Sequence, residues 1–323
     1  MKVGIIGAGS IAGTMAGTIR EMDCAQNYAV AARDYGRAAE FAQTYGFEKA
    51  YGSYEELVED AGVELVYIAT PHSHHYEHIK LCLNHGKHVL CEKSFTVNES
   101  QAREVLALAR EKKLLLTEAI WTRYMPMRKT LDSVLSSGVI GRPYMLTANL
   151  GYIISGKERI MRPELAGGAL LDVGIYPLNF ASMVFGDEVD FITGTAVMTE
   201  TGVDAQNSIT ITYKDGKMAA LCSSAMGLSD RRGIIYGDNG FIEVENINNC
   251  EGIRVYDRSR NMIASYDTPK QISGYEYEVE ACLRAIKEGA LECPEMPHEE
   301  TLRMMGWMDE LRRQWGLVYP MER

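Results

Sequence analysis

The sequence is poor in the residue patterns that stabilise secreted or metal-binding proteins. Its seven cysteines are scattered, and none of them forms a C-x-x-C pair or a Cys/His cluster at zinc spacing. An odd, unclustered set of this kind is typical of free thiols in a reducing compartment. We therefore expect a cytoplasmic protein without structural disulfides and without a metal site.

Positive charge and long apolar runs are also scarce. The 323 residues include 33 Lys and Arg against 44 Asp and Glu, which gives a net charge of −11, and no block of like charge stands out. Nucleic acid and anionic membrane surfaces are therefore poor partners. We also expect no membrane span and no signal peptide, because no apolar run has the required length or position. A chain of this length allows about two domains.

The start of the chain carries the clearest functional motif. A short apolar strand pattern runs into a glycine-rich turn, and a helical pattern follows. This order turns a G-x-G-x-x-[GA] match into a dinucleotide-binding fingerprint. Gly7 allows the tight turn, Gly9 lets a pyrophosphate approach the backbone, and Ala12 permits close helix–strand packing. The pyrophosphate would bind at the helix start, around Ser10 and Ile11. A tight turn that binds no ligand is the alternative.

The second predicted strand, residues 28–32, bears on the choice between NAD and NADP. In NAD sites an acidic residue at the end of this strand binds the ribose hydroxyls. Here Ala32 is followed by Arg33, and Arg37 lies one turn later. Guanidinium groups bind phosphate through paired hydrogen bonds, so the pattern favours the 2′-phosphate of NADP. NAD stays possible, because Asp34 is either a helix N-cap or the ribose acid and both arginines could be solvated.

Apolar runs alternate with helical patterns up to about residue 120, which predicts a doubly wound parallel sheet covered by helices. Ligands then bind beyond the carboxyl ends of the strands. Polar residues follow those ends, namely Thr70, Pro71, His72, Glu92, Lys93 and Glu118. After about residue 142, alternating strands and hairpin signals predict a largely antiparallel sheet. We therefore expect a nucleotide domain, residues 1–120, and an α+β domain, residues 121–323, whose C-terminal helix packs back on the first domain.

Three residues are candidates for catalysis. Lys93 follows the strand ending at Glu92, so its side chain should project towards the nicotinamide, where a lowered pKa would help it move a proton. Asp172 and Tyr176 are four residues apart and share one face if they begin a helix. Tyr176 beside Lys93 could accept a proton, and Asp172 could bind a substrate hydroxyl or pair with Lys93. The alternatives are a surface lysine, a helix cap at Asp172 and a half-buried Tyr176.

Residues near two other strand ends are candidates for ligand contact. Four histidines lie within residues 71–78, but no companion Cys or carboxylate cluster has metal-ligand spacing. One of them, with His75 as our candidate, is expected to contact ribose or substrate. Trp121 could form a wall against the nicotinamide or substrate, and Arg123 could reach a polar ligand. A buried hinge between the domains is the alternative for this segment.

Together these motifs resemble the glucose–fructose oxidoreductase/inositol dehydrogenase (Gfo/Idh/MocA) family. Four motifs appear in the family's order: the glycine-rich turn, Thr70–His75, Gly86–Lys93 and Gly167–Pro177. Within the family, three segments resemble the branch of dimeric trans-dihydrodiol and NADP-dependent D-xylose dehydrogenases, namely Glu118–Pro126, Leu170–Pro177 and Thr201–Asp204. That branch has Tyr, at the position of Tyr176, where most relatives have His.

The resemblance implies a Rossmann domain and a substrate domain built on an open, mostly antiparallel sheet, often used to form a homodimer or higher oligomer. It implies Lys93 and Tyr176 as the catalytic pair, with Asp172 and His75 nearby. It also implies hydride transfer between NADP(H) and a carbinol or carbonyl carbon of a small polyol, aldose (sugar) or trans-dihydrodiol. The family's Glu-Lys-Pro has Ser94 in place of proline, and serine disfavours the cis peptide often found there.

Two other functions are compatible with the same fold. A redox-assisted glycosidase would oxidise and re-reduce a bound sugar without net cofactor turnover, and Arg33 and Tyr176 speak against it. A non-catalytic NADP-binding sensor would not need Lys93, Asp172 and Tyr176 together. We therefore expect an NADP-dependent dehydrogenase or reductase.

Overall fold

The computed structural model describes residues 1–323, and the chain divides into two compact units. The first unit contains Met1–Tyr124 and Gln271–Met305, and the second contains Met125–Lys270 and Gly306–Arg323. Helix α10 (His298–Trp315) begins in the first unit and ends in the second. Each unit is therefore built from two separate segments of the chain.

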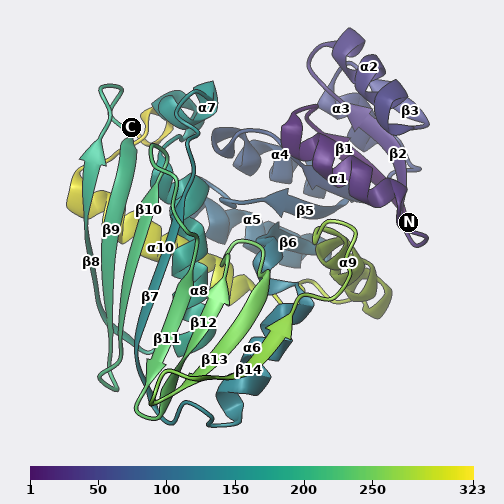
Figure 1. The fold of residues 1–323 in the computed structure, drawn as a ribbon. Helices are drawn as coiled ribbons and strands as arrows, with labels where there is room; N and C mark the ends of the chain where they lie inside the picture. The colour runs from purple at the N-terminus through teal and green to yellow at the C-terminus, as the bar shows by residue number, and fades with distance from the viewer. The chain divides into compact units, whose positions relative to one another are not determined.

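A parallel sheet of six strands forms the centre of the first unit (Figure 1). Its strand order is β3-β2-β1-β4-β5-β6, and every neighbouring pair is parallel. This confirms the predicted doubly wound sheet, in which the strand order reverses between β1 and β4. The strands are β1 (Lys2–Ile6), β2 (Gln26–Ala31), β3 (Lys49–Tyr51), β4 (Leu65–Ile68), β5 (His88–Glu92) and β6 (Leu116–Ala119). The helices are α1 (Ser10–Arg20), α2 (Tyr35–Tyr45), α3 (Tyr54–Glu59), α4 (His72–Asn84), α5 (Glu99–Lys112) and α9 (Glu276–Glu288).

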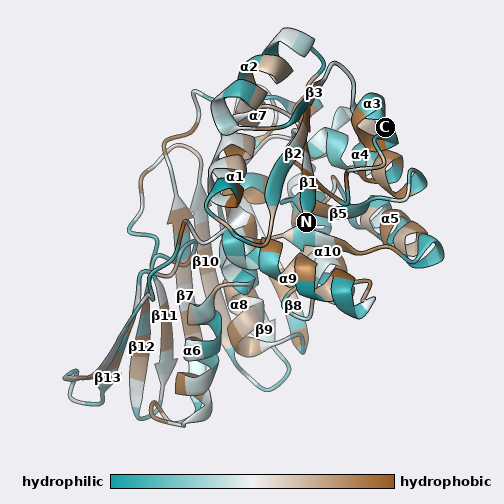
Figure 2. Cartoon of the chain, turned by 90° about the vertical axis from the view of Figure 1, so that its right-hand side faces the viewer, coloured by the Kyte–Doolittle hydropathy of each residue, from teal (hydrophilic) through white to brown (hydrophobic).

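The central strands are buried along almost their whole length. Ile5 and Ile6 in β1, and Tyr67 and Ile68 in β4, have almost no exposed surface. Continuous burial of this kind is typical of parallel strands covered on both faces. The covering helices are amphipathic, and Figure 2 shows hydrophobic and hydrophilic segments alternating along α5 and α9.

Helix starts in the first unit fall into two groups. In α2, α3 and α5 a side chain caps the helix: Asp34, Ser53 and Asn98 each accept a backbone N–H three residues later, at 2.7, 3.2 and 2.9 Å. Helices α1, α4 and α9 start after Gly9, Pro71 and Tyr275 without a side-chain cap. Of these three, α1 and α4 follow β1 and β4, the strands at the reversal of the sheet order.

The second unit contains an eight-stranded, mostly antiparallel sheet, as predicted (Figure 1). Its order is β14-β13-β12-β11-β7-β10-β9-β8, and the β7–β10 pair is parallel. The strands are β7 (Pro143–Gly151), β8 (Val189–Met198), β9 (Asp204–Tyr213), β10 (Met218–Ser224), β11 (Gly233–Gly237), β12 (Gly240–Glu245), β13 (Gly252–Asp257) and β14 (Met262–Asp267). The helices are α6 (Pro126–Ser136), α7 (Glu158–Met161) and α8 (Ile175–Phe185), with a π-helical turn at Leu170–Gly174.

The two faces of this second sheet differ in burial. On the inner face, Ile211, Ala219 and Leu146 lie in register and are fully buried, and α8 packs on β7 and β10. On the outer face, Thr212 and Met218 are paired and partly or largely exposed. The alternation therefore gives the sheet one packed face and one accessible face.

Four elements, β3, α6, α7 and β14, were not predicted from the sequence. Strand β3 has three residues, and β14 is mostly exposed, so neither has a buried face that would give a clear alternation. Helix α6 buries Met127, Leu131 and Val134, whose spacing is typical of a helix, so this helix could have been predicted from the sequence.

One helical segment, Pro163–Phe185, is long and apolar enough by length and composition to cross a membrane. This corrects the expectation that the sequence holds no such stretch. Within the structure, 89% of its apolar window is buried inside the protein. The segment therefore has the burial of a core helix.

Candidate nucleotide and catalytic site

The glycine-rich turn leaves open space where it meets α1. Gly7 adopts a positive φ of 103°, and a Cβ there would lie 2.9 Å from the carbonyl oxygen of Ala69. A Cβ at Gly9 would meet nothing within 4 Å, so this side of the turn is free for a ligand. Ala12 is fully buried, and the first turn of α1 carries no acidic residue. The uncapped helix start, the open space and the absence of negative charge fit a pyrophosphate group.

Two arginines, Arg33 and Arg37, and one carboxylate, Asp34, follow the end of β2. Asp34 caps α2 by accepting the N–H of Arg37 at 2.7 Å. The Arg37 guanidinium donates to the carbonyl oxygen of Ala8 in the glycine-rich turn at 2.9 Å. Arg33 is exposed, and its positive charge adds to burial in lowering the pKa of His74. Arg33 therefore lies close to the start of α4, and Asp34 has the capping role.

His75 occupies a buried position between two strand ends. Its ring nitrogens lie 2.8 Å from the carbonyl oxygens of Thr70 and Ser94, and burial lowers its pKa to about 4. Burial likewise lowers the pKa of His78 to about 4, and its Nδ1 lies 3.0 Å from Thr70 Oγ1. His75 therefore lies between the segments after β4 and β5, and as a neutral imidazole its single N–H donates to one of the two carbonyl oxygens. Among residues 1–323, no group of three His, Cys, Asp or Glu side chains is arranged to hold a metal ion.

Lys93 lies at the carboxyl end of β5 and is anchored through its neighbour. The Lys93 N–H donates to Glu92 Oε2 at 3.2 Å, and the Tyr67 hydroxyl donates to Glu92 Oε1. Glu92 and Tyr67 are both buried. The Lys93–Ser94 peptide bond is cis, although serine replaces the family's proline. The carboxylate of Glu92 thus fixes the backbone from which the Lys93 side chain extends.

Two further buried carboxyl groups lie in the first unit. Glu118 Oε1 accepts the Phe95 N–H at 3.1 Å, Oε2 has no hydrogen-bond partner, and burial raises its pKa to about 7. Glu278, on α9, is fully buried and neither of its oxygens has a partner. Burial, and next the charge of Glu92, hold the pKa of Glu278 well above its usual range. Sequence analysis missed Glu278, although it lies on the apolar face of α9 with Val279 and Cys282.

Trp121 and Arg123 are packed inside the first unit. The Trp121 ring stacks on Tyr275, with centroids 4.2 Å apart and planes 18° apart. Arg123 is buried and forms an ion pair with Glu300, which also pairs with Arg303. Arg123 therefore holds an ion pair within the first unit, with a partner so distant in the sequence that local pattern does not indicate it. A contact of Arg123 with a polar ligand stays a prediction.

In the second unit, Asp172 and Tyr176 lie at an irregular helix start. Asp172 is in the π-helical turn and Tyr176 is in the first turn of α8. Both are buried, and Arg159 of α7 donates to Asp172 Oδ1 at 2.5 Å. Arg159 was not identified from the sequence, because a four-residue helix gives no periodic signal. π-Helical turns often occur at functional sites, so this segment has a feature that is typical of such sites.

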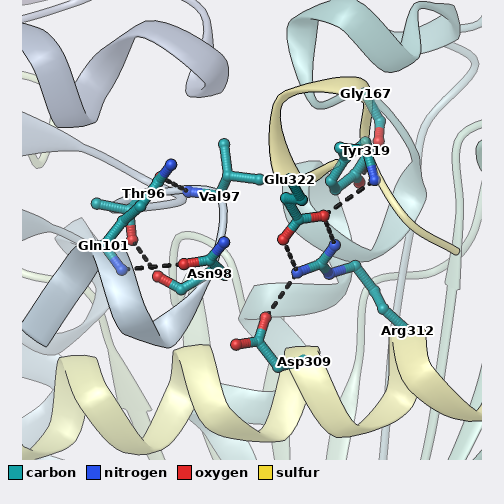
Figure 3. A network of polar contacts seen from close by, with 9 residues as sticks. All are labelled: Thr96, Val97, Asn98, Gln101, Gly167, Asp309, Arg312, Tyr319 and Glu322. Atoms are coloured by element: carbon teal, nitrogen blue, oxygen red, sulfur yellow. Dashed lines mark hydrogen bonds and ion pairs between the residues drawn. The ribbon is translucent and has the colours of Figure 1, made fainter.

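The turn before Asp172 is held by the C-terminal tail (Figure 3). The Tyr319 hydroxyl donates to the Gly167 carbonyl oxygen at 2.6 Å, and Arg312 lies over the Tyr319 ring at 4.9 Å. Arg312 also binds both carboxylate oxygens of Glu322, at 2.7 and 2.9 Å, and Asp309 at 2.7 Å. We call Arg312, Tyr319 and Glu322 the C-terminal lock.

Figure 3 also draws the loop that connects β5 to α5 in the first unit. Thr96 Oγ1 donates to the Asn98 carbonyl at 2.8 Å, and the Gln101 side chain accepts the Val97 N–H at 3.2 Å. The loop that follows Lys93 is therefore stabilised by hydrogen bonds among residues 96–101.

Comparison with known proteins identifies the family. The model for the oxidoreductase family with an NAD-binding Rossmann fold matches residues 1–120, and the GFO/IDH/MocA C-terminal domain matches residues 129–243. The chain belongs to the GFO/IDH/MocA family. It is an NAD(P)-dependent oxidoreductase that acts on CH–OH groups. The family resemblance seen in the sequence is therefore confirmed.

Members of the GFO/IDH/MocA family match this chain over its full length. The trans-1,2-dihydrobenzene-1,2-diol dehydrogenases of Xenopus tropicalis and Homo sapiens are 33% and 34% identical to it, over 99% and 100% of this chain and 99% of each relative. The 3-ketoreductase KijD10 from Actinomadura kijaniata, solved with NADP and TDP-benzene, has a TM-score of 0.90 and 25% identity over 97% of both chains. An aldose–aldose oxidoreductase from Caulobacter crescentus, 18% identical over 97% of both chains, shares the fold with a TM-score of 0.88.

Proposed function

We propose that this protein transfers a hydride between NADP(H) and a carbinol or carbonyl carbon of a small polyol, aldose or trans-dihydrodiol. The observation that carries the proposal is the full-length similarity to trans-1,2-dihydrobenzene-1,2-diol dehydrogenases, in a chain with Lys93 at the end of β5 and Tyr176 after the π-helical turn. Neutral small molecules are the substrates, in keeping with a net charge of −11 that disfavours nucleic acid and anionic membranes. The free cysteines favour the cytoplasm.

NADP supplies the hydride acceptor when it is bound. The glycine-rich turn, with Gly7, Gly9, Ser10, Ile11 and Ala12, binds the pyrophosphate at the start of α1. Arg33 and Arg37 bind the 2′-phosphate, since Ala32 provides no carboxylate and Asp34 is occupied as a helix cap. The segment Thr70–His72, Glu92 and Trp121 line the nicotinamide end. Arg123 stabilises this end through its ion pair with Glu300.

Proton transfer is assigned to Lys93 and Tyr176 in this proposal. Lys93 hydrogen-bonds the reacting oxygen and Tyr176 accepts its proton, or the two act in the opposite order through one shared network. Asp172 accepts a hydrogen bond from a substrate hydroxyl. His75 acts as a positioning residue, because both of its ring nitrogens face backbone carbonyls of the segments that carry Thr70 and Lys93. In this proposal residues 1–120 form the cofactor domain and residues 121–323 form the substrate domain, although residues 121–124 and 271–305 pack in the first unit.

We also propose a homodimer formed through the outer face of the second sheet. One row of paired residues crosses all eight strands on this face and contains mainly large apolar side chains: Phe191, Thr212, Met218, Met145, Tyr236, Phe241, Tyr256 and Met262. Four of them, Phe191, Met218, Met145 and Met262, are largely exposed. A continuous apolar row of this kind suits a two-fold, self-complementary interface.

The function is tested by measuring NADP reduction by the purified protein with aldoses, vicinal diols and inositols. We expect turnover with at least one class and a higher kcat/KM with NADP than with NAD. Tight NADP binding without turnover on any substrate would contradict the proposal and favour a sensor. Hydrolysis of a glycoside with no net NADPH formation would favour a redox-assisted glycosidase.

A further inference from the structure

The catalytic candidate Asp172 has a charged neighbour that reaches it from outside the core. Arg159 donates from its NH1 group to Asp172 Oδ1 at 2.5 Å. The Asp172 side chain is 6% exposed, whereas the Arg159 side chain is 40% exposed. A guanidinium has five N–H donors, and the contact with Asp172 uses one of them. The pair therefore combines a buried carboxylate with a cation that keeps donors available on its exposed side.

Helix α7, which carries Arg159, is short but firmly held. The Gly168 N–H donates to the Ile160 carbonyl at 2.8 Å, and the Gly167 N–H donates to the Arg162 carbonyl at 3.1 Å. A Cβ at Gly167 would lie 2.5 Å from the Ile160 oxygen and 2.7 Å from the Arg159 oxygen. The glycine turn thus packs directly on the backbone of Arg159, and only glycine fits at this distance.

The C-terminal lock also holds the glycine turn at Gly167. The Tyr319 hydroxyl binds the Gly167 carbonyl, and the buried guanidinium of Arg312 lies over the Tyr319 ring and binds Glu322 (Figure 3). Gly167 is therefore fixed on one side by α7 and on the other by the tail. A half-exposed arginine on a four-residue helix would ordinarily be mobile. These contacts hold the backbone of α7 in place, and a ligand-binding arginine needs such a fixed backbone.

We propose that Arg159 is a specificity-determining residue that binds the hydroxyl next to the reacting carbon and so selects vicinal diols over simple alcohols. The inference rests on the proposed function, in which Lys93 and Tyr176 bind the reacting oxygen. It names Arg159 as the group that binds the neighbouring oxygen. An Arg159 N–H donates a hydrogen bond to that second oxygen, while Asp172 accepts a hydrogen bond from a substrate hydroxyl. A vicinal diol supplies an oxygen to both groups. A simple alcohol supplies no second oxygen, so the guanidinium contributes nothing to its binding.

The test compares Arg159→Met with Arg162→Met in the NADP-loaded, full-length protein. Arg159 lies in α7 and Arg162 directly follows it, and each replacement removes one positive charge. Arg162 pairs with Glu158 and Glu164 and not with Asp172. The probes are trans-1,2-cyclohexanediol and cyclohexanol, and the readout is the ratio of their kcat/KM values. We expect Arg159→Met to lower this ratio ten- to a hundredfold, mainly through KM for the diol, about the scale of one charge-assisted hydrogen bond. Arg162→Met should leave it unchanged.

Two further variants separate binding from a structural effect. Arg159→Lys keeps a cation with donors and should restore part of the ratio. Tyr319→Phe removes the hydrogen bond to Gly167 without changing charge, and it should lower the ratio severalfold at unchanged NADP affinity. Tyr319→Phe also tests the inference should Arg159→Met fail to fold. An unchanged ratio in Arg159→Met, or an equal fall in Arg162→Met, would overturn the proposal.

Direct binding distinguishes this inference from the proposed function. Saturation-transfer NMR of trans-1,2-cyclohexanediol with the NADP-loaded protein reports binding without turnover. Diol binding that is lost in Arg159→Met and kept in Arg162→Met would support the role of Arg159 even in a protein that does not turn over the diol. Diol binding that Arg159→Met leaves intact would refute that role whatever the turnover.

Discussion

Replacing Glu278 should stabilise the protein, and the gain should depend on pH. Glu278 is fully buried on α9, neither carboxyl oxygen has a hydrogen-bond partner, and Glu92 adds negative charge nearby. Burial, followed by the Glu92 charge, raises its pKa well above the ordinary value. The folded protein therefore keeps the Glu278 proton at a pH where the unfolded chain has lost it.

The sign and size of the effect follow from proton linkage. Below about pH 4 the side chain is protonated in both states, so it adds no pH-dependent term. As pH rises, the unfolded state alone ionises, and the free energy of unfolding falls by about 1.4 kcal/mol for each pH unit until the raised pKa is reached. Glu278→Gln cannot ionise and avoids this loss. Its stability relative to wild type should therefore rise between about pH 4.5 and 7.5.

Urea unfolding at several pH values measures this difference. Glu278→Gln should gain in midpoint from pH 4.5 to 7.5 at constant m value. Glu280→Gln, an exposed position on the same helix, should stay within about 0.5 kcal/mol of wild type at every pH. Glu278→Met also removes both unpartnered oxygens, and it should gain in addition at pH 4.5. A Glu278→Gln gain that is flat with pH, or a loss that grows with pH, would refute the reasoning.

The remaining predictions concern the cofactor and the interface. Arg33→Ala should weaken NADP binding ten- to more than a hundredfold, equivalent to about 1.5–3 kcal/mol, and leave NAD binding almost unchanged in fluorescence titrations. Gly9→Ala should leave the melting temperature unchanged, because a Cβ there meets nothing within 4 Å, and should weaken NADP binding in the same titration. Met218→Lys should convert a dimer into a folded monomer in sedimentation experiments at micromolar concentration, and a wild-type monomer would contradict the interface.

The parallel sheet was predictable because its determinants are local. Strands β1, β4 and β5 are short apolar runs, and the turns after them carry the glycines and polar residues that mark strand ends. Edge strands and exposed strands lack that signal, which explains why β3 and β14 were missed. The contribution of residues 271–305 to the first unit depends on long-range packing, such as the stacking of Tyr275 on Trp121.

Candidate site residues could be placed from the sequence only where the end of a strand fixes their position. Gly7, Gly9 and Lys93 lie where the strand ends place them. The assignments of His75 and Arg123 to ligands stay predictions. The contacts of His75 with the carbonyls of Thr70 and Ser94, and of Arg123 with the carboxylate of Glu300, were not predicted from the sequence. Arg159 and Glu278 were missed for the same reason, since their environments come from segments distant in the sequence.

The catalytic pair is tested most directly by the turnover of Lys93→Met, Tyr176→Phe and the double variant, measured as NADP reduction across pH. Each single variant should lose about a hundredfold or more in kcat, the scale of a lost acid–base group, with NADP affinity nearly unchanged. The double variant should be little worse than the worse single variant, because the two residues act as a unit. Near-normal turnover of Tyr176→Phe at every pH would contradict the pair and leave Tyr176 a packing residue.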